Sequence, residues 1–192
     1  MTFKASKHAK MENKIEYIEE NNELTILIYP LYDKRKQNML TTWLVLFSLC
    51  GLAIISQFFY DYPSSTKLFF VVYLIFWLFF EFKVIYAIRW RKFGKEVITI
   101  DNESIYLTKK IGNRGVTERY DLTAIDSIEA LKHKGKLVYE MSSSYWNSNH
   151  YTLTVNINKQ QIPFGIDLNG QQTKKMIKTL KETVKNRVEN KL

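Results

Sequence analysis

A run of 22 residues without one charged side chain, residues 39–60, constrains this chain more than any other feature. About 20 apolar residues in a helix cross a bilayer core of about 30 Å. A second apolar run covers residues 68–88, with Glu81 and Lys83 near its end. Residues 61–67 connect the two runs and contain a proline before a serine and threonine cluster, which favours a turn and a helix N-cap. The sequence therefore predicts two antiparallel transmembrane helices joined by a short external loop.

Positive side chains predict how this hairpin is oriented. Three cations precede the first run and four follow the second, whereas the connecting loop contains only Lys67. Lys and Arg near the ends of transmembrane helices stay on the cytoplasmic side. We therefore expect a multi-pass protein of the cytoplasmic membrane with both termini in the cytoplasm. The flanking cations are Lys34, Arg35, Lys36, Arg89, Arg91, Lys92 and Lys95.

Charged side chains inside a membrane segment are functional candidates by default. Lys83 is six residues, about 9 Å along a helix, from Arg89, so its ammonium can reach the headgroups. Glu81 lies deeper and cannot face Lys83, because residues i and i+2 lie on different sides of a helix. Glu81 is therefore either a partner-contact candidate or the partner of a cation that flanks the first helix.

The polar segments before the hairpin leave two questions open. Residues 1–22 mix charges and predict a disordered or frayed-helix tail, in which Met11 is an alternative start. Residues 23–38 form a short strand and juxtamembrane segment, and within it residues 24–29 (LTILIY) are rich in β-formers. This run either lies at the membrane interface or adds a strand to the domain behind the hairpin, and we favour the added strand.

Behind the hairpin, from Gly94 onward, apolar residues recur with the period of two that is typical of strands. About seven short strands are predicted, at the spacing of a sandwich or barrel. They cover residues 96–100, 104–109, 116–122, 125–131, 137–141, 151–158 and 161–165.

One amphipathic helix is predicted over residues 171–189. Its apolar side chains fall on one face at helical spacing, and its lysines lie elsewhere. Such a stripe needs a sheet or the end of a barrel to cover it. The apolar residues are Met176, Ile177, Leu180, Val184 and Val188.

The run GKEVITIDNESIYLTKK, directly after the hairpin, resembles the opening of bacterial pleckstrin-homology-like domains in small membrane proteins. The ending IPFGIDLNGQQTKKMIKTLKETV looks like their last strand and capping helix. The resemblance covers residues 94–189 and implies a seven-stranded, partly open barrel capped by one C-terminal helix, on the cytoplasmic side of a bacterial inner membrane. It also implies a non-catalytic binding or scaffolding module that contacts a protein partner, itself or anionic lipid headgroups.

The residue types that catalyse reactions in other proteins are scattered along this chain. His8, His133 and His150 lack metal-ligand spacing, and Cys50, the single cysteine, excludes an intramolecular disulfide. Residues 142–144 are three serines without a G-x-S-x-G setting, and no glycine-rich phosphate loop occurs. We therefore expect no enzyme, no cofactor and no metal site.

Basic turns are candidates for contact with lipid headgroups. Since the second helix delivers the chain to the first strand of the domain, the turn after the second strand returns to the membrane-near end. The turn after the fourth strand should return too, although in this fold the chain crosses between sheets there. The alternative is that both are ordinary solvated turns. Beside Arg89, Arg91 and Lys92, the candidates are Lys109, Lys110, Arg114, Lys132, Lys134 and Lys136.

The loop over residues 142–150 is the most unusual polar segment. Aromatic side chains anchor interfaces, so Tyr145 and Trp146 are partner-contact candidates. Alternatively, one of the two rings folds back to cover the end of the barrel.

Two further classes of function compete with the binding module. The chain could be a subunit or assembly factor of a larger membrane complex that docks through the hairpin. A nucleic-acid binder is suggested only by charge, since residues 89–192 hold 19 Lys and Arg against 11 Asp and Glu. The cations lack the aromatic interleaving of a base-stacking platform, and no nucleic-acid partner is expected.

Overall fold

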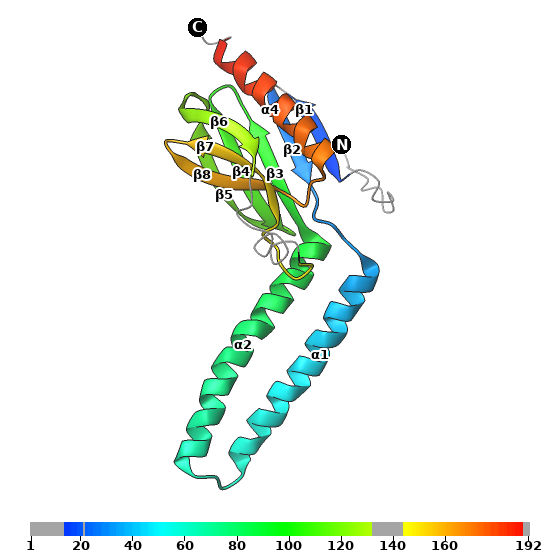
Figure 1. The fold of residues 1–192 in the computed structure, drawn as a ribbon, viewed down its shortest axis with the longest axis vertical. Helices are drawn as coiled ribbons and strands as arrows, with labels where there is room; N and C mark the ends of the chain where they lie inside the picture. The colour runs from blue at the N-terminus through cyan, green and yellow to red at the C-terminus, as the bar shows by residue number, and fades with distance from the viewer. Residues whose placement is uncertain (1–13, 21, 132–143, 190–192) are drawn as a thin grey trace. The chain divides into compact units, whose positions relative to one another are not determined.

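The computed structural model describes residues 14–20, 22–131 and 144–189 (Figure 1). It divides into two units. The β unit comprises Met1–Leu31, Gly94–His133 and His150–Leu192, and the helical unit comprises Tyr32–Phe93 and Lys134–Asn149. Four predicted features lie outside the described residues: the strand over residues 137–141 and the cations Lys132, Lys134 and Lys136 of the turn before it.

The helical unit is a pair of antiparallel helices. Helix α1 spans Lys34–Ser56, a 3-10 turn η1 spans Gln57–Phe59, and α2 spans Ser64–Phe93. Both helices are long and apolar enough to cross a membrane, and only 6% of the most apolar 18-residue window of each is buried. This confirms two long apolar helices joined as a hairpin.

The helices are longer than the apolar runs. Helix α1 begins five residues early because the carboxylate of Asp33 accepts hydrogen bonds from the backbone N–H groups of Arg35 and Lys36, at 2.9 and 3.1 Å. Helix α2 continues through its charged end to Phe93. Lys and Arg are good helix formers, so the loss of hydropathy at residue 89 does not end the helix.

The two helices approach closely at Gly51. A Cβ atom there would lie 2.1 Å from a ring carbon of Trp77, so only glycine leaves room for the indole. The indole N–H of Trp77 donates to the carbonyl oxygen of Phe47 at 2.9 Å. This hydrogen bond fixes the indole between the helices.

The first sheet of the β unit has five antiparallel strands in the order β1-β2-β3-β4-β5. The strand predicted over residues 24–29 is confirmed as β2, which pairs with β3. The prediction of a disordered or helical tail over residues 1–22 is wrong where the structure describes it, because β1 pairs with β2 along its whole length. The strands are β1 Ile15–Glu20, β2 Glu23–Ile28, β3 Gly94–Ile100, β4 Ser104–Ile111 and β5 Arg114–Asp121.

The helical unit is an insertion between two adjacent strands. Ile28, the last residue of β2, pairs with Glu96 near the start of β3. The chain therefore leaves the sheet and re-enters it at the same end, and Gly94 of β3 directly follows Phe93 of α2.

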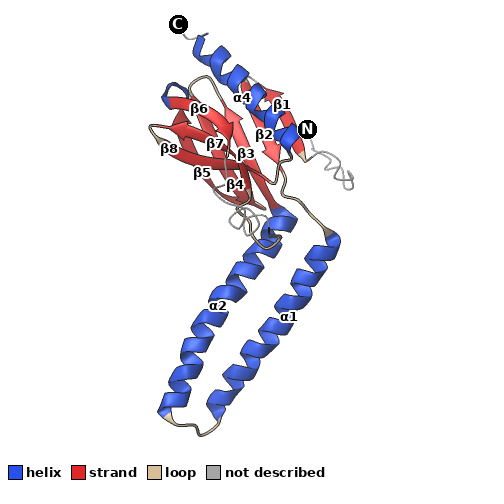
Figure 2. Cartoon of the chain, in the orientation of Figure 1, coloured by secondary structure: helices blue, strands red, loops and turns tan. Residues whose placement is uncertain are grey.

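The second sheet has three antiparallel strands, β6 Ile125–Ala130, β7 Tyr151–Ile157 and β8 Gln160–Ile166. The chain changes sheets at the 3-10 turn η2, Leu122–Ala124, between β5 and β6. The change of sheet expected after residues 125–131 falls on residues outside the described ones; among the described residues β6 pairs directly with β7. Figure 2 shows that strands, in red, make up most of the β unit.

Helix α4, Gly170–Glu189, follows the second sheet and packs against β6, β7 and η2. Its predicted stripe is confirmed, since Met176 and Leu180 are fully buried. The β unit is thus a mainly β fold with a C-terminal helix. Among the described residues neither sheet closes into a barrel, so the helix covers a sheet face there.

Candidate functional site

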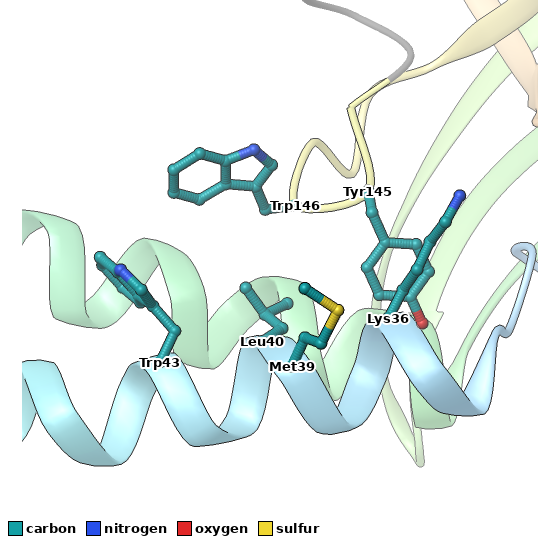
Figure 3. A pocket seen from close by; sticks show the side chains of 6 residues that line it. All are labelled: Lys36, Met39, Leu40, Trp43, Tyr145 and Trp146. Carbon is teal, nitrogen blue, oxygen red and sulfur yellow. The ribbon is translucent and has the colours of Figure 1, made fainter.

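A row of side chains along one face of α1 forms the floor of a pocket (Figure 3). Lys36, Met39, Leu40 and Trp43 have the spacing i, i+3, i+4 and i+7, which places them on one side of a helix. The pocket has a volume of about 290 Å³ and is completed by Tyr145 and Trp146 from the loop before β7. The row changes along the helix from a charged to an apolar, aromatic end.

The loop over residues 144–149 is fastened to the helical unit by Arg91. This side chain is only 5% exposed, and its guanidinium donates to the carbonyl oxygens of Tyr145 and Asn147, at 3.1 and 2.9 Å. It also lies 4.9 Å from the centre of the Tyr145 ring. Arg91, a predicted headgroup ligand, is therefore engaged inside the helical unit and holds the loop.

Tyr145 ties the same loop to the start of α1. Its hydroxyl donates to the side-chain oxygen of Gln37 at 3.0 Å, and the backbone of Asp33 lies within hydrogen-bond distance. Burial is the main cause that raises the pKa of Tyr145 above its usual value. The phenol is therefore a neutral donor at physiological pH.

The apolar end of the pocket is aromatic and open. The rings of Trp43 and Trp146 meet edge to face, with centroids 5.9 Å apart. In Figure 3 these indoles lie at one end of the row, and Lys36 and Tyr145 at the other. Trp146 is 54% exposed although it touches Trp43. The pocket thus offers an uncovered apolar surface beside an ammonium group.

The two partner-contact candidates of the loop, Tyr145 and Trp146, are therefore in one site. The sequence did not reveal that α1 supplies the other wall, because Lys36 and Trp43 looked like ordinary flanking and membrane-facing residues. The spacing of Lys36, Met39, Leu40 and Trp43 was the available signal. Their pairing with a loop more than 100 residues further along the chain depends on Arg91, which no local pattern marks.

Two of the predicted headgroup ligands, Lys110 and Arg114, lie at one end of the first sheet together with Lys95. Lys95 and Lys110 are direct cross-strand neighbours, and Arg114, the first residue of β5, pairs with Ile111, the last residue of β4. Like charges placed opposite each other on a sheet are unfavourable. We define the cationic sheet end as Lys95, Lys110 and Arg114; it is the end at which the chain enters β3.

The other predicted cations are dispersed. The ammonium of Lys109 lies 4.4 Å from the centre of the Tyr151 ring. Arg89 and Lys92 are exposed in the last turns of α2.

Glu81 of α2 contacts a polar side chain of α1 rather than one of the cations that flank this helix. Its carboxylate accepts a hydrogen bond from the hydroxyl of Ser48 on α1, midway along the hairpin. No cation flanking α1 pairs with it among the described residues. Its second oxygen, Oε2, is buried without a hydrogen-bond partner in that part of the chain.

A buried carboxyl group lies in the β unit, where sequence reasoning assigned none. Glu96 of β3 is 3% exposed, and its Oε2 accepts the backbone N–H of Ile166 at 2.8 Å. Burial raises the pKa of Glu96 to about 7, although this hydrogen bond and the charge of Lys109 act in the opposite direction. The alternating pattern of β3 placed Glu96 on the inner face, so its position was readable from the sequence.

Close to Glu96, His150 and Asp167 join the ends of β7 and β8. His150 Nδ1 lies 3.1 Å from Asp167 Oδ1, and the backbone N–H of Leu31 donates to Asp167 Oδ2 at 3.1 Å. The side chain of Lys14 donates to the carbonyl oxygen of Asp167. Asp167 therefore connects the beginning of β1, the exit of β2 and the end of β8, which is a structural role.

The described residues contain no group of three or more His, Cys, Asp or Glu side chains that could hold a metal ion. No protein-family model matches the chain, and no curated protein is significantly similar to it.

Proposed function

We propose that this protein is a non-catalytic, membrane-anchored binding module. Helices α1 and α2 hold it in the bilayer, and the β unit binds anionic lipid headgroups through the cationic sheet end. The pleckstrin-homology-like assignment and the bacterial cytoplasmic membrane belong to the same proposal.

The exposure of the two apolar helices carries this proposal. Helices of 23 and 30 residues leave almost all of their most apolar windows uncovered. Each large apolar side chain left in water lacks the stabilisation of about 1.5–3 kcal/mol that burial would provide. A bilayer removes this cost, and a helical hairpin satisfies its own backbone hydrogen bonds there.

The order of elements supports a pleckstrin-homology-like fold. From β3 onward, three antiparallel strands, a change of sheet at η2, three further strands and α4 follow one another. These are six described strands, since the predicted strand over residues 137–141 lies outside the described residues. Two N-terminal strands, β1 and β2, extend the first sheet.

The cationic sheet end supports a lipid-headgroup ligand. Lys95 and Lys110 face each other across two strands, so their ammonium groups repel each other. An anion between or beside the two ammonium groups would offset this repulsion. An anionic leaflet attracts Lys and Arg near its surface by about 1 kcal/mol each.

A larger membrane complex is the second candidate, favoured by the hydrogen-bonded pair of Ser48 and Glu81 inside the hairpin. Polar groups at that depth mark functional sites more often than not. Co-purification of a fixed set of proteins in mild detergent, lost in Glu81→Leu, would favour it.

Topology is the first test of the anchoring. In a Cys50→Ser background, a cysteine at Ser65 should react with a membrane-impermeant thiol reagent in intact cells. One at Lys185, an exposed position of α4, should react only after permeabilisation. The reverse pattern of labelling would contradict the proposed orientation, and extraction of the chain by alkaline carbonate would contradict the anchoring itself.

The cationic sheet end can be tested without the hairpin, because β2 and β3 are adjacent. A chain in which a short glycine linker replaces residues 32–93 should bind vesicles containing phosphatidylglycerol and dissociate in high salt. Replacing Lys95, Lys110 and Arg114 by Gln should weaken binding on the order of 100-fold, at about 1 kcal/mol per cation. The measurement is vesicle cosedimentation.

The matched control removes three charges elsewhere on the β unit. Lys174, Lys178 and Lys181 of α4 are all exposed, and their replacement by Gln should matter much less. Equal losses in the two triple variants would mean that binding follows net charge, and the cationic sheet end would have to be abandoned.

A further inference from the structure

We propose that the pocket formed by α1 and the loop over residues 144–149 binds one anionic phospholipid from the cytoplasmic leaflet. This inference rests on the proposed membrane anchoring and assigns to the helical unit a lipid site of its own, apart from the cationic sheet end.

The residues that line the pocket change from charged to apolar along α1, in the same order as the parts of a phospholipid from headgroup to acyl chain. Lys36 begins the row, Met39 and Leu40 follow within one turn, and Trp43 ends it. From Lys36 to Trp43 the helix rises about 10 Å at 1.5 Å per residue. A phosphate at Lys36 would place the glycerol backbone over Met39 and Leu40, and the first acyl methylenes at Trp43.

The position of the pocket along α1 also fits a phospholipid. Residues 36–43 belong to the first turns of α1, where charged residues give way to the apolar run. Trp and Tyr gather at this level of a membrane because their rings combine apolar bodies with polar groups. Trp43, Tyr145 and Trp146 lie around the pocket at that level.

Charge favours an anionic over a zwitterionic headgroup. None of the six lining residues is acidic, and Lys36 is exposed at the rim. The nearest acidic side chain in sequence, Asp33, is engaged by the backbone N–H groups of Arg35 and Lys36. A choline group would bring a second positive charge towards Lys36, whereas a glycerol headgroup would not.

The site is prepared before a ligand arrives. Arg91 and Gln37 hold the backbone and the ring of Tyr145, so binding need not order the loop. Preorganisation of this kind lowers the entropic cost of binding. A volume of about 290 Å³ is at the lower limit of small-molecule sites, which suits part of a lipid whose tails continue along the hairpin.

The test uses the full chain in detergent micelles and native mass spectrometry. Phosphatidylglycerol and phosphatidylcholine with identical acyl chains are added in equal amounts. The chain should retain phosphatidylglycerol about fivefold more than phosphatidylcholine, the ratio expected for one cation at an anionic headgroup. Lys36→Gln should bring that ratio to one, and Trp146→Ala should lower retention of both lipids.

Lys34→Gln is the matched control, because Lys34 is exposed in the same turn of α1 but does not line the pocket. It should keep the fivefold preference. All three substitutions affect exposed side chains, and the helical circular dichroism of each variant should equal that of the original chain.

The remaining outcomes overturn the inference. Equal effects of Lys34→Gln and Lys36→Gln would show that the preference follows diffuse charge. A dimer that forms without lipid and is lost in Trp146→Ala would make a second copy the occupant. A chain that resists carbonate extraction but retains neither lipid refutes the pocket and leaves the anchoring intact, whereas a chain released by carbonate refutes both.

Discussion

Replacing Leu180 by Asp is expected to unfold the β unit. Leu180 is fully buried where α4 packs on β6 and β7. Loss of a large buried side chain costs about 2–5 kcal/mol, and an unpaired buried carboxylate adds several more. Since domains are stable by only about 5–15 kcal/mol, the sum is comparable with the whole stability. Limited proteolysis of the purified chain should show rapid digestion of the β unit.

Lys178→Asp is the control for this prediction, with the same new side chain two residues away. Lys178 is highly exposed, and its ion pair with Glu182, at 3.8 Å, is an i,i+4 surface contact. Such pairs contribute about 0.3–0.5 kcal/mol. The variant should resist protease almost as well as the original chain; similar digestion of the two variants would disprove the packing of α4.

Glu96 is expected to make the stability of the β unit fall as the pH rises from about 4.5 to about 7. In the folded chain burial keeps the pKa of Glu96 near 7, whereas the ordinary value is 4.5. Between these values the unfolded chain binds fewer protons than the folded chain, so raising the pH favours unfolding. The loss from pH 5 to pH 8 should be about 2–3 kcal/mol, at 1.36 kcal/mol per pKa unit.

Glu96→Gln should remove this slope, because an amide stays neutral and its oxygen can still accept the backbone N–H of Ile166. The measurement is the free energy of unfolding in detergent at pH 5 and pH 8. Glu129→Gln, at an exposed carboxyl of β6, should keep the slope of the original chain. If Glu96→Gln loses as much stability as the original chain over this range, Glu96 is not protonated in the folded state.

Local sequence patterns identify some residues of the candidate site and miss others. Tyr145 and Trp146 stood out because two aromatic residues in a polar loop need an apolar contact. Arg91 did not, because its neighbours Arg89 and Lys92 have the same sequence context and remain exposed. Only the position of the loop decides that Arg91 is buried and binds two carbonyl oxygens.

The sequence alone determined the two long apolar helices, the described strands from β2 onward and the stripe of α4. These follow from hydropathy and from periods of two and 3.6, which depend on neighbours along the chain. The alternation of β3 puts Glu96 on the same face as Ile98 and Ile100, a signal from which its burial could have been predicted. The first strand, β1, was not predicted because it is rich in glutamate. Glutamates suit an exposed edge strand, but they also make the segment look like a polar tail.

The tertiary structure decided which elements pair and which side chains meet. It set the change of sheet at η2, placed the helical unit between adjacent strands, and joined α1 to the loop over residues 144–149. Ser48 rather than a flanking cation meets Glu81 for the same reason. Such contacts depend on the register and approach of segments far apart in sequence, which no local periodicity specifies.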